Sequence, residues 1–272
     1  MRTEADEARY RLGWLLQDAY RDPDDALHTF QALVKTDRRT PWRYRALFDI
    51  AEVMLRADRF AEAEAAYTLV VRERRGHQEA EVARFRIAES HFLAGNFDGA
   101  QDLLDGLLSG SATRDALNDA LALSILIQDG QADPEALNAY AAALKLKRRQ
   151  KPKAALRAFQ DLTDRHSEST LLDRTLARKI ELLESLERYP EAIGTCRRLI
   201  ADLPWSPLCP WAQMALGRIY NNRLGQVYDA AKAYETLLID YPKSLEADGA
   251  RDRLRALQNK IEELDARQKE TG

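Results

Sequence analysis

Histidine and cysteine are the side chains of this sequence best suited to metal binding or nucleophilic catalysis, and their spacing assembles no such site. No two histidines form the His-Glu-x-x-His pair of a zinc enzyme. Cys196 and Cys209 are too far apart for a Cys-x-x-Cys metal or redox motif, although one disulfide between them stays possible. We therefore predict no catalytic residue, no metal site and no cofactor. The four histidines are His28, His77, His91 and His166.

Motifs for phosphate binding and ester hydrolysis are missing as well. There is no Gly-x-x-x-x-Gly-Lys-Ser/Thr loop, and Ser109 is misplaced for a Gly-x-Ser-x-Gly elbow. The net charge of −3 gives no basic excess for a nucleic-acid backbone. The basic cluster at residues 145–153 is interpreted as a solvated helix C-terminus in preference to a phosphate-binding patch. No apolar run approaches the ~20 residues of a membrane-spanning helix.

A helical pattern organises the chain instead. Alanine is followed four residues later by a bulky or sulfur-bearing residue and seven residues later by an aliphatic one, which is one face of an α-helix. The anchoring alanines lie 37, 37, 55, 37 and 38 residues apart, and 55 is 37 plus the length of one extra helix with its turn. We predict three helix pairs, an extra helix at 113–128, and three more pairs. The anchors, predicted to pack between helices, are Ala26, Ala63, Ala100, Ala155, Ala192 and Ala230.

Each anchor is preceded, twelve or thirteen residues earlier, by a mostly small residue on the first helix of its pair. A small residue lets two helices approach closely while large neighbours fill the space beside the contact. Lys179 and Ile180 break this rule, so the first helix of the fifth pair is the least regular. The six positions are Gly13, Ala51, Ala88, Ala143, Ile180 and Gly217.

The pattern divides the chain into residues 1–110 (pairs one to three), 111–132 (extra helix and turn), 133–243 (pairs four to six) and 244–272 (capping helix and tail). The tail repeats apolar residues at spacings of three and four, which is typical of a coiled-coil seam. It either caps the last pair or pairs with another helix. Its apolar residues are Ala247, Ala250, Leu254, Leu257, Ile261 and Leu264.

These residues resemble the tetratricopeptide repeat (TPR) family over about residues 5 to 243. Departures are the period of 37, and a repeat-end proline that is matched only by Pro204 and Pro242. The resemblance implies an all-α superhelix of six helix pairs, an extra helix between pairs three and four, and a C-terminal capping helix. The segment Asp240–Ser244 also resembles repeats of bacterial envelope proteins of the BamD and YbgF type. That likeness favours the periplasm over the cytoplasm, if a leader was removed.

In this family the first helices line a concave surface. Its column of glutamates suggests a partner with basic or amide side chains. The aromatic column Tyr10, Phe48, Phe85 and Tyr140 either anchors the partner or packs against the adjacent repeat. The predicted partner-binding residues are Trp14, Gln17, Glu52, Glu89, Lys147, Glu181, Arg218 and Asn221.

We therefore expect a non-catalytic scaffold that binds a peptide segment or helix of another protein on its concave face, does not bind nucleic acid and has no membrane-spanning segment. Two alternatives stay open. The chain either self-assembles through its C-terminal helix or is a repeat region excised from a larger bacterial protein.

Overall fold

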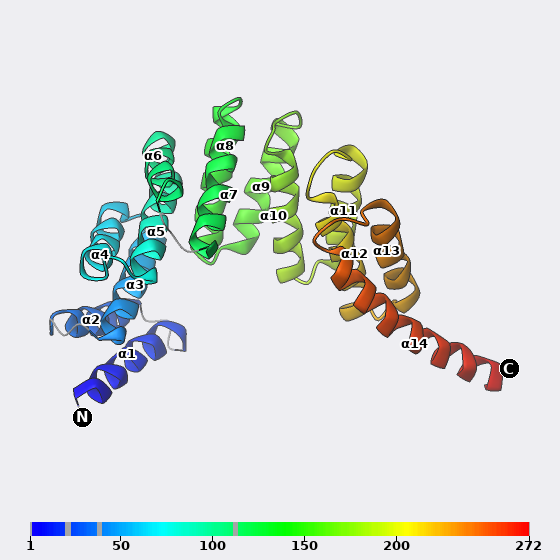
Figure 1. Ribbon diagram of the computed structural model, residues 1–272, viewed down its shortest axis with the longest axis horizontal. Coiled ribbons are helices and arrows are strands. Elements are labelled where there is room, and N and C mark those ends of the chain that lie inside the picture. The colour runs from blue at the N-terminus through cyan, green and yellow to red at the C-terminus, as the bar shows by residue number, and fades with distance from the viewer. Residues whose placement is uncertain (1, 20–22, 37–39, 111–113, 272) are drawn as a thin grey trace. The chain divides into compact units, whose positions relative to one another are not determined.

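The computed structural model describes residues 2–19, 23–36, 40–110 and 114–271. Over these residues the chain forms fourteen α-helices and no β-strand, which confirms the all-α helical-repeat class (Figure 1). The helices are α1 (Arg2–Asp18), α2 (Pro23–Val34), α3 (Pro41–Arg56), α4 (Phe60–Glu73), α5 (Gln78–Ala94), α6 (Phe97–Leu108), α7 (Arg114–Gly130), α8 (Pro134–Arg148), α9 (Pro152–Arg165), α10 (Leu172–Ser185), α11 (Tyr189–Asp202), α12 (Cys209–Asn222), α13 (Val227–Asp240) and α14 (Ala247–Thr271).

The helices form two compact units, residues 1–151 (unit 1) and residues 152–272 (unit 2). In unit 1, α1 packs with α2, α3 with α4 and α5 with α6; in unit 2, α10 packs with α11 and α12 with α13. Each second helix also packs against the next first helix. The division of the chain by repeats at 110, 132 and 243 stays a prediction. The six anchoring alanines, three in each unit, are all fully buried, at 0% exposure.

Small residues set the distance between paired helices. A Cβ atom on Gly13 would lie 2.5 Å from the Phe30 ring, and one on Gly217 would lie 2.3 Å from the Tyr234 ring. The irregular fifth pair carries the opposite arrangement, with Ile180 on the first helix and Cys196 at the aromatic position, both fully buried. Residue volume is thus exchanged between the two helices, which keeps the contact filled.

Three of the described turns inside the pairs share one left-handed design. Asp58, Gly95 and Glu187 have φ angles of 58°, 83° and 59°. In each turn the following residue donates its N–H to a carbonyl five residues earlier, as in the 2.9 Å bond from Arg188 to Leu183. This is the hydrogen bond of a Schellman turn, where glycine is preferred because it has no Cβ. Two of these three turns therefore place a side chain in a costly conformation.

The predicted extra helix is α7, and it occupies the position of a first helix. Ala120, Ser124 and Ile127 lie 37 residues after three buried residues of α5, and all three are buried. Helix α7 packs against α5 and α6, as α3 packs against α1 and α2. Helix α8 does not complete the pair. It contacts α7 and also packs against α5 and α3.

The tail begins as the predicted cap. Ala247, Ala250 and Leu257 of α14 are buried, and Leu254 and Ile261 are partly buried in the same apolar cluster with residues of α13. The Leu264 side chain lies outside the described residues.

Replacing Glu187 with glycine should stabilise the fold. Left-handed backbone costs an L-residue roughly 1–2 kcal/mol, and the greater chain entropy of glycine in the unfolded state returns part of that gain. We expect the free energy of unfolding, measured by urea titration, to rise by about 0.5–1 kcal/mol. Gly95→Ala should lower it, and a loss of stability in Glu187→Gly would contradict this account of the turns.

Two glycine-to-alanine substitutions should have opposite effects. Gly217→Ala places a methyl group against the Tyr234 ring, where there is no room for it. The resulting overpacking should lower the free energy of unfolding by about 1–3 kcal/mol. Gly194 lies on the exposed side of α11 with no atom within 4 Å of a built Cβ. Gly194→Ala should therefore stabilise the helix by about 0.5–1 kcal/mol. Thermal denaturation of both variants and the parent chain should show a lower melting temperature for Gly217→Ala and a higher one for Gly194→Ala.

Candidate partner-binding site

The first helices α1, α3 and α5 of unit 1 contact in sequence, α1 with α3 and α3 with α5, and we call these three helices the first-helix row. The row carries four of the predicted partner-binding residues. Trp14 is 51% exposed. Gln17 is half-buried, and its Oε1 atom is buried without a hydrogen-bond partner. The side chains of Glu52 and Glu89 are only 30% and 23% exposed.

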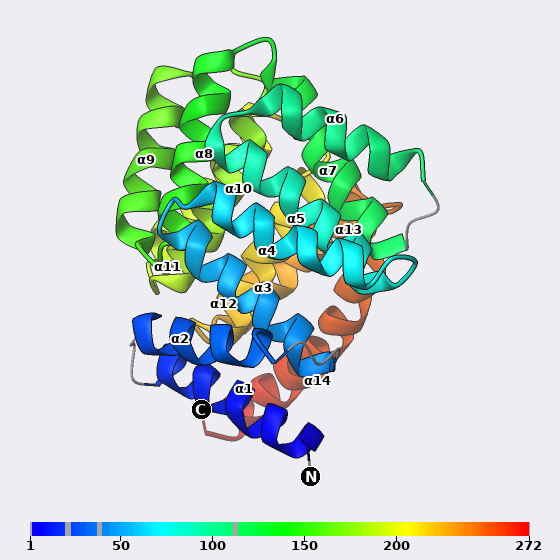
Figure 2. The same cartoon turned by 90° about the vertical axis from the view of Figure 1, so that its left-hand side faces the viewer.

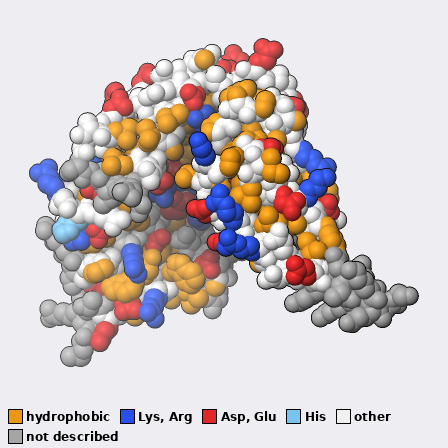
Figure 3. Space-filling view, turned by 45° about the vertical axis from the view of Figure 1, so that its right-hand side comes forward, with side chains coloured by type: hydrophobic (Ala, Val, Ile, Leu, Met, Phe, Trp, Pro, Cys, Tyr) orange, Lys and Arg blue, Asp and Glu red, His pale blue; other side chains and the backbone are white. Residues whose placement is uncertain are grey.

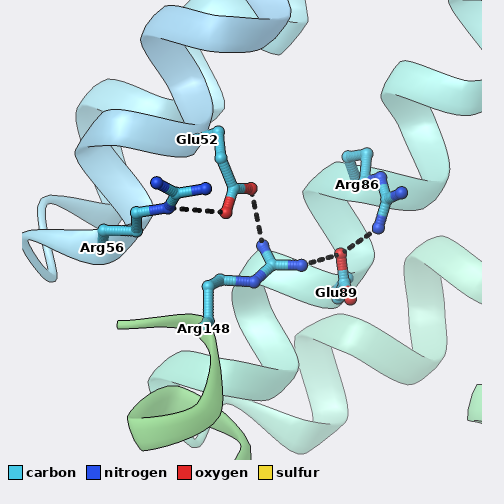
Figure 4. Close-up of polar contacts among 5 residues, drawn as sticks. All are labelled: Glu52, Arg56, Arg86, Glu89 and Arg148. Carbon is cyan, nitrogen blue, oxygen red and sulfur yellow. Dashed lines mark hydrogen bonds and ion pairs between the residues drawn. The ribbon is translucent and has the colours of Figure 1, made fainter. Parts of the chain in front are cut away.

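The two glutamates share one arginine from α8 (Figure 4). Arg148 Nη2 lies 2.8 Å from Glu89 Oε2, and Arg148 Nη1 lies 3.4 Å from Glu52 Oε2. Each carboxylate also contacts an arginine of its own helix, since Arg56 Nε lies 3.3 Å from Glu52 and Arg86 Nη1 lies 2.7 Å from Glu89. The structure thus brings Glu52 and Glu89 together, and three guanidinium groups compensate their charge.

The basic end of α8 also contacts the α3/α4 pair of unit 1 at two further points. Arg149 forms an ion pair with Asp58 in the turn after α3, and Lys145 Nζ lies 5.9 Å from the centre of the Phe60 ring. Lys147 is half-buried on the same turn of the helix. The interpretation of this cluster as a solvated helix end is therefore wrong for Arg148 and Arg149, whose charges are used inside unit 1.

A tyrosine–aspartate contact joins α1 to α3. Tyr10 hydrogen-bonds Asp49, and burial, reinforced by the Asp49 charge, raises the pKa of Tyr10 to about 12. Burial likewise raises the pKa of Asp49. The Tyr10 ring also packs on Phe30 and Trp42, with centroid distances of 5.8 and 5.4 Å. This first member of the aromatic column therefore packs within the protein.

Unit 2 holds the remaining predicted residues. Arg218 of α12 donates to Glu184 of α10 at 2.6 Å, which bridges two first helices as Arg148 does in unit 1. Glu181 is paired with Arg178 at 2.9 Å on its own helix. Asn221 donates to the side chain of Asn222 at 2.9 Å. Charged residues at these positions in both units are thus paired within the protein.

Sequence reasoning missed Asp49 and the arginines that contact the glutamates. The spacings of Arg56 from Glu52 and of Arg86 from Glu89 are those of helical ion pairs and could have been found. Arg148 carried no such signal, because its partners lie 96 and 59 residues earlier in the chain. The surface in Figure 3 shows both signs of charge interspersed with apolar side chains.

The candidate chemical groups have structural partners. His91 contacts Glu64 at 3.3 Å and Asn96 at 3.0 Å. Cys196 and Cys209 are free and buried, and burial raises the pKa of the Cys196 thiol to about 12, so little thiolate forms at neutral pH. Among the described residues no group of side chains could hold a metal ion, and no helix is both long and apolar enough to cross a membrane.

These features define a helical-repeat protein in which the first helices of unit 1 contact one another in sequence. Two family models, each described as tetratricopeptide repeat, match residues 10–78 and 211–244. The chain therefore carries tetratricopeptide repeats over these residues, and this repeat is typical of protein–protein interaction scaffolds. No curated protein matches the sequence.

Solved structures with the same kind of repeat are similar at low identity. The TPR2AB domain of yeast Sti1, in complex with an Hsp90 peptide, is 15% identical, with 94% of this chain and 99% of that chain covered and a TM-score of 0.40. A tetratricopeptide repeat protein from Parabacteroides merdae is 14% identical, with 94% and 99% covered and a TM-score of 0.38. The TPR domain of P58(IPK) is 17% identical, with 92% and 77% covered and a TM-score of 0.35.

Removing the shared arginine should loosen unit 1. Arg148→Gln leaves two partly buried carboxylates without their common cation, and hydrogen bonds to charged groups contribute about 1.5–3 kcal/mol. We expect the free energy of unfolding to fall by about 1–3 kcal/mol, with a smaller difference in 1 M salt, which screens charges. Arg59→Gln, which removes an exposed ion pair with Glu62, is the control and should change stability little. Equal losses in the two variants would contradict the role given to Arg148.

Proposed function

We propose that this chain is a non-catalytic scaffold that binds a peptide segment or helix of a partner protein on the first-helix row. In the family the first helices line the concave face of the solenoid. The observation that carries the proposal is Trp14, a large aromatic side chain half exposed on this row. Tryptophan is enriched among the residues that dominate interface energetics.

The internal ion pairs change the expected partner. Arg148 contacts both glutamates, so the row attracts a basic side chain less than the sequence suggests. The side chain of Gln17 is half-buried on the same helix as Trp14, and its amide oxygen is closed to solvent. A segment that places an apolar side chain on Trp14 suits this surface better than a basic one.

Self-assembly through the C-terminal helix is less well supported. Ala247, Ala250 and Leu257, half of the predicted coiled-coil seam, are buried, and they share an apolar cluster with α13 residues. They are therefore not offered to a second copy. Location in a bacterial envelope stays a prediction from the motif at residues 240–244.

The test is a comparison of proteins captured from the native lysate by the parent chain and by Trp14→Ala plus Gln17→Ala. The matched control is Trp205→Ala, which removes a tryptophan that is 69% exposed in the turn before α12. Arg218 stays unchanged, because it is paired with Glu184.

We expect proteins that the parent and the control capture and the double variant loses. Identical sets from all three proteins would place binding elsewhere. Capture of the chain alone would favour self-assembly.

A further inference from the structure

Helix α1 carries an apolar line of residues that other first helices bury. Ala5 and Ala8 are exposed, Leu12 is 51% exposed and Leu15 is 41% exposed. These four residues, spaced three, four and three apart along one helical face, are called the docking seam. Figures 1 and 2 show α1 at the end of unit 1, with no element of that unit on its outer side.

The equivalent residues of later first helices are covered. In α5 they are Ala80, Ala83, Ile87 and Ser90, which are 0%, 0%, 7% and 1% exposed. In α12 they are Cys209, Ala212, Leu216 and Ile219, which are 0%, 0%, 5% and 0% exposed. In each case the preceding second helix packs against the first helix, α4 against α5 and α11 against α12. Within the described residues, the docking seam of α1 is thus a repeat interface that no second helix covers.

Helix α14 shows what fits such a seam. Residues 247–257 are identical to residues 5–15 at seven positions, including all four of the seam, where both helices read Ala, Ala, Leu, Leu. The seam of α14 is buried or partly buried in a cluster with Val227, Ala231, Tyr234 and Leu238 of α13. The identical positions are Ala5 and Ala247, Asp6 and Asp248, Ala8 and Ala250, Arg9 and Arg251, Arg11 and Arg253, Leu12 and Leu254, and Leu15 and Leu257.

The arginine before the first leucine adds a preference for tyrosine. In α14, Arg253 acts on the phenol of Tyr234 from α13 and opposes the rise that burial causes in its pKa. In α5, Arg86 stands at the same place and acts in the same sense on Tyr67 from α4. Arg11 is the equivalent residue of α1, and its side chain is 73% exposed beside Glu7.

From this we infer that the docking seam of α1 binds a helix of another protein that presents a tyrosine among small and aliphatic residues, as α13 does. Such a helix would lie across Ala5, Ala8, Leu12 and Leu15 with its tyrosine beside Arg11. The seam lies on another face of α1 from Trp14, and Trp14→Ala leaves it intact. Binding at the docking seam can therefore be tested separately from the proposed binding on the first-helix row.

The probe is a fluorescent peptide of residues 226–241 of this chain with Thr236→Glu, held helical by a lactam bridge between the side chains at positions 232 and 236. It is titrated into the full chain. We expect saturable binding that weakens at least tenfold for Leu12→Asp plus Leu15→Asp, and severalfold for Arg11→Gln or for a peptide with Tyr234→Ala. The control protein, Leu121→Asp plus Ile125→Asp, changes two exposed residues of α7 and should bind as the parent does.

Ala8→Gln is a second variant that adds bulk at the seam and keeps a good helix former there, so it separates loss of binding from loss of α1. A photo-crosslinker at peptide position 238 should attach to residues 2–19. Attachment to residues 247–257, or equal binding to all variants, would overturn the inference. Self-association of the parent that Leu12→Asp plus Leu15→Asp abolishes would assign the seam to a second copy and would also overturn it.

Discussion

The close contact between a small residue on one helix and a large one on its partner is the constraint from which the rest of each unit follows. It fixes how near two paired helices lie, and through the shared second helices it fixes the spacing of neighbouring first helices. Gly217 against Tyr234 shows the limit, because even a methyl group has no room there. Only at this spacing can one guanidinium, that of Arg148, contact carboxylates from both α3 and α5.

Polar contacts then determine what the surface offers to a partner. Tyr10 with Asp49, Arg148 with Glu52 and Glu89, and Arg218 with Glu184 all join different helices. Such partly buried pairs hold neighbouring helices in position, and they also use the charges that a partner would otherwise meet. The surface left over is aromatic, amide and aliphatic in character. Recognition by shape and apolar contact suits it better than recognition by charge.

The fold could be predicted from the sequence because its signal is local and repeated. The anchoring alanines and the spacing of about 37 residues predict the helices up to α13, with the extra helix in the same register, and the spacing of apolar residues in the tail predicts α14. The site could be predicted only in part. Glu52 and Glu89 follow from their place in the repeat, but their burial depends on Arg148, which belongs to a helix that leaves the regular pairing. A contact between residues 59 and 96 positions apart leaves no trace in a single sequence, and no periodicity foretells that α8 turns toward α3 and α5.

The exchange of volume in the fifth pair has a consequence for engineering. A repeat consensus would place a small residue at position 180 and an aromatic one at position 196, as in the neighbouring pairs. Either change alone would open a cavity or force an overlap, because the existing Ile180 and Cys196 already fill that space. The two positions therefore form a single unit of variation. A consensus design that chooses the residue at each repeat position independently will damage the packing of this pair. Changing positions 180 and 196 together preserves it.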